Sequence, residues 1–279
     1  MANDTGEAGT EIPALFRPIT IRGMTLPNRI VMSPLCMYSA DDGLVGDWHV
    51  VHLGSRAMGG AGLVIAEMTA VHPDGRISWR DAGIWDDRHI AGWKRVVDFV
   101  HRHTDGKIGL QLGHAGRKGD TGESWMRGSG GETVIGMDLI APSALPVSDR
   151  ARVPREITPD EIAKLPGLYA RATERALEAG FDMLELHCAH GYLLSTFISP
   201  VSNKRTDAYG GSLENRMRLP LEVFRAIRAV WPEERPISVR ISAVDWEEGG
   251  HTIADAVAVS RMFHDAGADL IDVSSGMVT

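Results

Sequence analysis

The fold is decided by one stretch, residues 183–192, which reads MLELHCAHGY. An apolar run ends there at two histidines three residues apart, His187 and His190, and Tyr192 follows directly after a glycine. Successive side chains of a strand point to opposite faces, so Glu185 and His187 lie on one face and two leucines on the other. The stretch therefore predicts a strand with an aliphatic face and a polar face, with two imidazoles and a phenol near its carboxyl end.

Two further apolar segments share this pattern. Residues 108–112 read IGLQL and residues 237–241 read ISVRI, so Gln111 and Arg240 lie opposite the aliphatic side chains. Such runs alternate with amphipathic stretches along the chain, which predicts parallel strands joined by helices. The predicted strands span residues 30–33, 63–67, 108–112, 183–187, 237–241 and 270–273, and the predicted helices span residues 50–59, 90–103, 159–179, 213–230 and 253–266.

The polar strand face distinguishes a barrel from an open sheet. A doubly wound sheet is covered by helices on both faces and usually has a glycine-rich phosphate turn after its first strand. Here Pro34, Leu35 and Cys36 follow the first predicted strand instead. A (β/α)8 barrel has helices on its outer face only and an active site at the carboxyl ends of its strands. We predict an α/β chain of the TIM (β/α)8 barrel type, a single domain over residues 13–279 that follows a disordered tail over residues 1–12.

Charge and composition argue against several classes of protein. The formal net charge of −8 is unlike that of a nucleic-acid binder, which needs a basic surface. No apolar run approaches the ~18–20 residues of a membrane span. The first twelve residues lack the basic start and apolar stretch of a signal peptide. The two cysteines, Cys36 and Cys188, do not indicate a disulfide framework, and we expect reduced thiols in a cytoplasmic protein.

Six segments together resemble the old yellow enzyme family of FMN-dependent ene-reductases. They span nearly the whole chain after the tail, and their combination is highly specific. Cys36 and Tyr38, together with the pair His187 and His190, are similar to the branch typified by thermophilic-like bacterial ene-reductases. The resemblance is carried by residues 28–38, 111–118, 187–193, 199–207, 209–216 and 238–242.

The resemblance implies an FMN-dependent NAD(P)H oxidoreductase with NADPH or NADH as electron donor. Such an enzyme reduces the activated C=C bond of α,β-unsaturated carbonyl compounds by hydride transfer from flavin N5. His187 and His190 would bind the substrate carbonyl, Tyr192 would be the catalytic proton donor, and Tyr38 would complete the substrate-binding wall. Met68 stands where relatives often have a small residue, so we hypothesise that it narrows the substrate pocket. Cofactor-binding roles are implied for Ser33, Pro34, Leu35, Cys36, Met68, Gln111 and Arg240.

The residues alone leave alternatives open. Two histidines at this spacing are also typical of a zinc pair or a structural core pair, but no third ligand stands at a recognisable spacing, and we expect no metal site. Tyr192 is alternatively a packing aromatic, and Cys36 a small buried hydrophobe. Arg240 is alternatively the partner of Glu185, because a buried carboxylate needs one.

A basic segment follows Gln111 in the sequence. His114, Arg117 and Lys118 are expected at the mouth of the site, where they would either attract phosphates of NAD(P)H or of a coenzyme A ester, or form a solvated loop. The stretch 113–154 is too long for a simple connection, and a loop of that length is expected to cap a site.

A second resemblance widens the choice of function. Residues 209–230 and 269–276 are also similar to the reductase half of bifunctional aminobenzoyl-CoA or salicylyl-CoA enzymes. The alternatives are therefore the flavin reductase portion of an enzyme acting on aromatic CoA thioesters, or a non-catalytic barrel fragment. The chain stops after its sixth predicted strand, so we expect a truncated barrel without the two βα units that form the phosphate cradle in the family. We also expect a small-molecule enone or related substrate, a homo-oligomer (dimer or tetramer), and neither nucleic-acid nor membrane partners.

Overall fold

A six-stranded parallel sheet forms the centre of the computed structural model, which describes residues 12–121 and 135–279. The strand order is β10-β9-β8-β5-β4-β3. The tail predicted over residues 1–12 lies outside the described residues, apart from Ile12. All six predicted strands are confirmed, as β3 (Val31–Met32), β4 (Leu63–Ala70), β5 (Lys107–Gly113), β8 (Met183–Cys188), β9 (Ile237–Ser242) and β10 (Leu270–Ser274).

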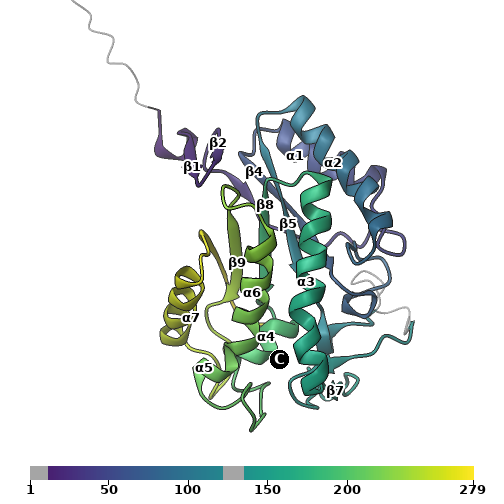
Figure 1. The fold of residues 1–279 in the computed structure, drawn as a ribbon, viewed down its shortest axis with the longest axis vertical. Coiled ribbons are helices and arrows are strands. Elements are labelled where there is room, and N and C mark those ends of the chain that lie inside the picture. The colour runs from purple at the N-terminus through teal and green to yellow at the C-terminus, as the bar shows by residue number, and fades with distance from the viewer. Residues whose placement is uncertain (1–11, 122–134) are drawn as a thin grey trace, which may run out of the picture.

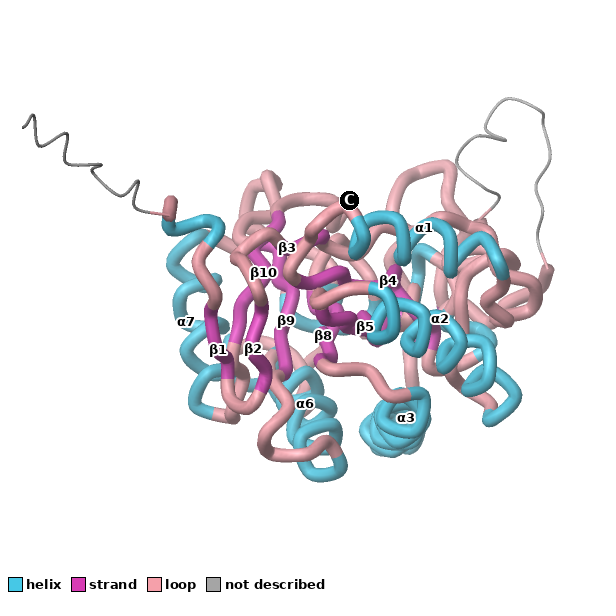
Figure 2. Tube along the Cα trace, turned by 90° about the horizontal axis from the view of Figure 1, so that it is seen from above, coloured by secondary structure: helices cyan, strands magenta, loops and turns pink. Residues whose placement is uncertain are grey.

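Helices cover the outer side of this sheet. Seen from above, the strands follow a curve with the major helices outside it, as in a portion of a (β/α)8 barrel (Figure 2). Two helices, α3 (Pro159–Ala179) and α6 (Arg218–Val230), run side by side across the sheet (Figure 1). The others are α1 (Asp47–Met58), α2 (Ile90–His103), α4 (Leu193–Ile198), α5 (Leu213–Arg216) and α7 (Ile253–Asp265).

The bounds of the helices follow local sequence signals. The α3 helix starts with a capping box, in which Thr158 and Glu161 satisfy each other's backbone N–H groups, and it ends at Gly180 with φ of 94°. The helix predicted over residues 213–230 is wrong as one element, because it divides at Met217 into α5 and α6. Pro220 lies in the first turn of α6, where a helix does not need the backbone N–H that proline lacks.

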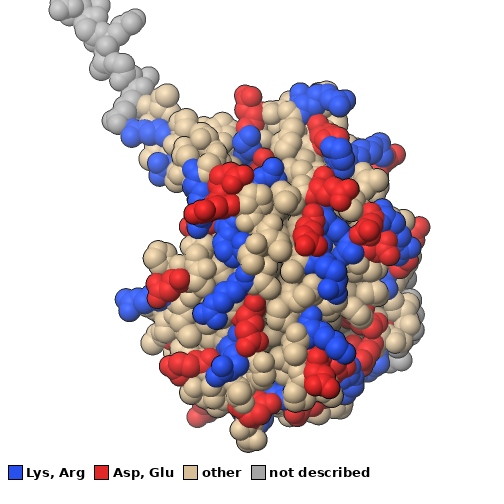
Figure 3. Space-filling model, viewed as in Figure 1, with Lys and Arg blue, Asp and Glu red and all other residues tan. Residues whose placement is uncertain are grey.

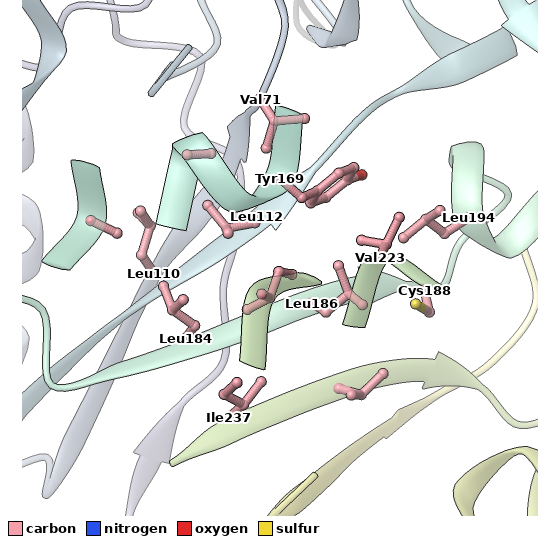
Figure 4. Packing of buried hydrophobic residues seen from close by; sticks show 14 of the residues in the cluster. Val71, Leu110, Leu112, Tyr169, Leu184, Leu186, Cys188, Leu194, Val223 and Ile237 are labelled. Carbon is pink, nitrogen blue, oxygen red and sulfur yellow. The ribbon is translucent and has the colours of Figure 1, made fainter. Parts of the chain in front are cut away.

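The aliphatic strand face is the core of the molecule. Leu110 and Leu112 of β5 and Leu184 and Leu186 of β8 are buried beneath α3 and α6 (Figure 4). Tyr169 of α3 lies among them. Burial of each leucine stabilises the fold by about 1.5–3 kcal/mol, so this layer is the main source of stability.

Several elements escaped the sequence-based prediction. A hairpin, β1 (Ile19–Ile21) with β2 (Met24–Leu26), packs against the amino ends of β4 and β8. The long stretch 113–154 contains the 3₁₀ turn η4 (Gly116–Lys118) and the strand β6 (Ile140–Ala141), which pairs in parallel with β7 (Arg155–Glu156). These pieces are too short to produce a periodic pattern of their own.

The surface carries charges of both signs. Lysine and arginine side chains alternate with aspartate and glutamate across the face seen in Figure 3, without a large patch of either sign. Within residues 12–121 and 135–279, no helix has both the length and the apolar character that crossing a membrane requires.

Candidate active site

The predicted catalytic side chains converge at the carboxyl ends of the strands. The ring centroid of His187 lies 5.1 Å from that of His190 and 5.0 Å from that of Tyr192. Tyr192 also packs with Tyr38 and Cys36 against the cluster that contains Met68. Residues from three separate parts of the chain thus form one wall, which we call the histidine cluster.

His187 is a buried and neutral hydrogen-bond donor. Its Nδ1 accepts the backbone N–H of Ala189 at 3.3 Å, which assigns the ring hydrogen to Nε2. Desolvation by burial, with the neighbouring charges of His190, Arg240 and Lys118, holds the pKa of His187 well below its usual range. The ring therefore presents an N–H without a charge at neutral pH.

His190 is fixed by two serines from neighbouring strands. Its backbone N–H donates to Ser242 Oγ at 3.0 Å, and its Nε2 lies 2.6 Å from Ser274 Oγ. The residue has φ of 62°, a left-handed conformation that needs support from its surroundings. Burial lowers the pKa of His190 to about 4. In this structure the imidazole is thus occupied by Ser274 rather than open to a ligand.

Tyr192 remains a phenol over the whole physiological range. Burial, with contributions from Cys36 and Tyr38, raises its pKa above the usual value. Lys118 lies 5.6 Å above the phenol ring and donates to the carbonyls of His190 at 2.8 Å and Met277 at 2.7 Å. The ammonium group thereby ties the end of the described chain to the histidine cluster.

The basic segment is more buried than the sequence suggests. Arg117 is 4% exposed and donates to the carbonyls of Leu145 and Val278, so it is not part of a solvated loop. His114 is also buried, and its ring stacks on that of His72 with the centroids 6.2 Å apart. Neither side chain lies at an open mouth of the histidine cluster.

A polar network covers the inner face of the sheet below the histidine cluster. Glu185 accepts hydrogen bonds from Gln111 Nε2 and from Ser238 Oγ, both at 2.9 Å, and burial raises its pKa to about 7. Arg240 donates to the carbonyl of Pro34 at 3.2 Å, and its Nε lies 3.3 Å from Asp272. The alternative pairing of Arg240 with Glu185 is therefore wrong. Its partner is the residue directly opposite on β10.

The segment that carries Cys36 and Tyr38 is held by a buried carboxyl group. Glu67 lies where the register between β4 and β5 shifts, and it accepts the backbone N–H of Met37 at 3.3 Å. Burial raises the pKa of Glu67 to about 8, so it is largely protonated at neutral pH. Burial also raises the pKa of the Cys36 thiol, which keeps it uncharged.

Two of the predicted cofactor residues keep hydrogen-bonding groups that suit a flavin. Gln111 uses one N–H on Glu185, which leaves its amide oxygen and second N–H for the edge of a heterocycle. Arg240 faces Asp272 with Nε and the Pro34 carbonyl with Nη1, and no described residue accepts from Nη2, which leaves that nitrogen for a ligand atom. Leu35 is 68% exposed. A cavity of about 290 Å³ lies at the amino ends of the strands, lined mostly by apolar residues of those strands and of the β1–β2 hairpin, and Gln111, Arg240 and His187 do not line it.

Some residues of the site were not predicted from the sequence. Ser242 lies in the segment that carries Arg240, but its bond to His190 depends on strand order. Ser274 and Glu67 gave no signal, because a serine or a carboxylate at the end of a strand is common. Among the described ranges 12–121 and 135–279, no cluster of three histidine, cysteine, aspartate or glutamate residues is arranged to hold a metal ion.

Comparison with known proteins agrees with this arrangement. The model of the NADH:flavin oxidoreductase / NADH oxidase family matches residues 14–278. The chain is 48% identical over 266 residues to an NADPH dehydrogenase of Geobacillus sp. (strain WCH70), covering 95% of this chain and 73% of that protein.

Solved structures share the fold. Morphinone reductase superposes with a TM-score of 0.82 at 33% identity, covering 95% of this chain and 72% of that one. A 2-naphthoyl-CoA reductase in complex with 2-naphthoyl-CoA superposes with a TM-score of 0.85 at 28% identity, covering 94% of this chain and 40% of that one. The chain therefore belongs to the NADH:flavin oxidoreductase family and is an FMN-dependent oxidoreductase of the old yellow enzyme type.

Proposed function

We propose that this enzyme reduces the activated C=C bond of α,β-unsaturated carbonyl compounds with electrons from NADPH or NADH. The proposal rests on one observation: uncharged donors, the Nε2–H of His187 and the phenol of Tyr192, lie in one cluster with ring centroids 5.0 Å apart. A carbonyl oxygen needs a donor, and the adjacent carbon needs a proton. The cluster offers both without placing a buried charge beside the substrate.

The roles of the individual side chains follow from their contacts. FMN, when bound, supplies the hydride, and Gln111 and Arg240 would hold it, with backbone groups of Ser33, Pro34, Leu35, Cys36 and Met68. His187 would donate to the substrate carbonyl. His190 would join it by exchanging its 2.6 Å contact with Ser274 for the substrate. Tyr192 would deliver the proton, and Tyr38 would complete the substrate-binding wall.

The test begins with cofactor retention. The full chain is titrated with FMN, and binding is followed by quenching of flavin fluorescence. Consumption of NADPH and of NADH is then measured with 2-cyclohexenone under anaerobic conditions, and the saturated ketone is identified by mass spectrometry. A chain that binds FMN and oxidises NADPH but leaves cyclohexenone unchanged would refute ene-reduction.

Two variants assign the roles. His187→Ala should weaken binding of a phenol such as 4-hydroxybenzaldehyde by about tenfold, since a hydrogen bond of ordinary strength is lost. Tyr192→Phe should preserve that affinity and slow product formation by about 10²-fold or more, the usual contribution of a general acid. His264→Ala, on an exposed histidine of α7, is the matched control and should change neither quantity. Unchanged phenol affinity in His187→Ala would remove the carbonyl-binding role.

A second candidate is the reductase portion of an enzyme that acts on aromatic CoA thioesters. It is favoured by the superposition with 2-naphthoyl-CoA reductase, whose TM-score is 0.85. The same assay with benzoyl-CoA and 2-naphthoyl-CoA in place of cyclohexenone distinguishes the two. Consumption of NADPH that depends on the thioester and not on the enone would select this second candidate.

A further inference from the structure

A second cavity lies outside the barrel, away from the histidine cluster. It has a volume of about 490 Å³ and is bounded by α3, by the β6–β7 pair and by His72 and His114. Its floor is apolar and buried, formed by Ile140, Ile157 and Leu165. A cavity of ~300–1,000 Å³ with apolar walls and a few polar groups is typical of a site for a small molecule.

One polar group in the floor of this cavity lacks a partner. His114 is 4% exposed, and its Nδ1 accepts the backbone N–H of Gly116 at 3.0 Å. The ring hydrogen is therefore on Nε2, and no described residue accepts a hydrogen bond from it. Burial lowers the pKa of His114 to about 3, so the ring is uncharged. His114 lines the cavity, so a ligand oxygen in the cavity would accept this hydrogen.

The opening carries three acidic and three basic side chains, and two of the cations have no partner in the part of the chain that the structure describes. Arg155 binds both Asp138 and Glu161, at 2.6 Å each, so its charge is engaged. Lys164 and Arg171 of α3 also line the cavity, are exposed, and have no ion-pair or hydrogen-bond partner among the described residues. Of the remaining lining groups, only Asp74 is acidic, and it lies 3.8 Å from His72.

We propose that this cavity binds a small aromatic carboxylate that carries a second oxygen at the end opposite its acid group. The ring would lie on Ile140, Ile157 and Leu165. The second oxygen would accept the hydrogen of His114 Nε2, and the carboxylate would face Lys164 and Arg171. The site is independent of the flavin chemistry proposed above, because no residue of the histidine cluster lines it.

The proposal is tested by calorimetric titration of the full chain with 4-methoxybenzoate, which needs no catalytic activity. The expected result is one binding site. 4-Methylbenzoate, which lacks the second oxygen, and 4-methoxytoluene, which lacks the acid, should each bind several-fold more weakly. A protein that binds all three equally would show only apolar partitioning and would overturn the proposal.

Variants locate the site. Lys164→Glu combined with Arg171→Glu changes only exposed side chains and should weaken 4-methoxybenzoate binding about fivefold or more, because two exposed charge contacts are reversed. Arg225→Glu combined with Arg261→Glu makes the same change of net charge on α6 and α7 and should have no effect. His187→Ala should also leave the affinity unchanged. Loss of binding in His187→Ala, or unchanged binding in the α3 double variant, would place the ligand elsewhere.

Discussion

The two faces of the same strands are stabilised by different interactions. On β8, Leu184 and Leu186 face outward into a dry layer beneath α3 and α6, where dispersion and desolvation act without direction. Glu185 and His187, between and after them, face inward, where each polar atom needs a particular partner. The outer face stabilises the fold, and the inner face orients the polar side chains. A substitution should therefore change stability on the first and chemistry on the second.

The largest effect is expected on the outer face. Leu186→Ala removes a fully buried side chain and should lower the free energy of unfolding by about 2–5 kcal/mol. Urea unfolding followed by tryptophan fluorescence measures it. Val273→Ala on β10 is the control, since Val273 is 64% exposed and should change stability by less than about 0.5 kcal/mol. Equal losses in both variants would show that the outer layer is not the main source of stability.

A smaller loss of stability is expected on the inner face. There it should depend on whether the new side chain can accept a hydrogen bond. Glu185→Leu leaves Gln111 and Ser238 without their acceptor and should cost about 1–3 kcal/mol. Glu185→Gln retains an acceptor oxygen and should cost less. FMN titration of both variants adds a second readout, because Gln111 is oriented by this residue. If Leu and Gln behave alike, shape rather than hydrogen bonding maintains the inner face.

Buried acids also predict a pH dependence. Burial raises the pKa of Glu67 from 4.5 to about 8 and that of Asp81 from 3.8 to about 7. Between the ordinary and the raised pKa of each group, the folded chain binds more protons than the unfolded chain. The free energy of unfolding therefore falls as the pH rises through this range. The buried histidines have the opposite effect on stability, since the pKa of His190 is lowered to about 4. This effect is confined to pH values below 6.5.

Above pH 6.5 the carboxyl groups should therefore determine how the free energy of unfolding changes with pH. We expect the free energy of unfolding to fall by about 2–3 kcal/mol from pH 6.5 to pH 8, measured by urea titration at each pH. Glu67→Gln, which cannot ionise, should reduce this slope. A slope that is unchanged in Glu67→Gln would mean that the carboxyl group of Glu67 does not titrate in this range.

The smallest loss of stability is expected at Lys118, which ties the last described residues to the histidine cluster. Lys118→Met removes two hydrogen bonds to carbonyl oxygens and should lower stability by about 1 kcal/mol or less. Amide hydrogen exchange of residues 275–279 should accelerate more than that of β8. Lys118→Arg is the control, because it keeps the charge and the donors. Equal protection of residues 275–279 in the Met variant would show that other contacts hold them.

Sequence periodicity predicted the framework well, for reasons visible in particular elements. The α2 and α3 helices have the predicted bounds, because caps and glycine act within a few residues. The hairpin β1–β2 and the short helix α4 were not predicted, since each depends on distant residues for burial. β4 runs three residues past its prediction, to Ala70, with a change of register that no local signal marks.

Alternation along a strand is a local property of the backbone, so the order of residues was enough to show which side chains share a strand face and which strands end in polar groups. The partners of these side chains followed from the folded arrangement instead. Arg240 meets Asp272 and not Glu185, His190 meets Ser274, and His114 turns toward a separate cavity. These pairings depend on strand order and register between residues far apart in the chain, which no local pattern encodes.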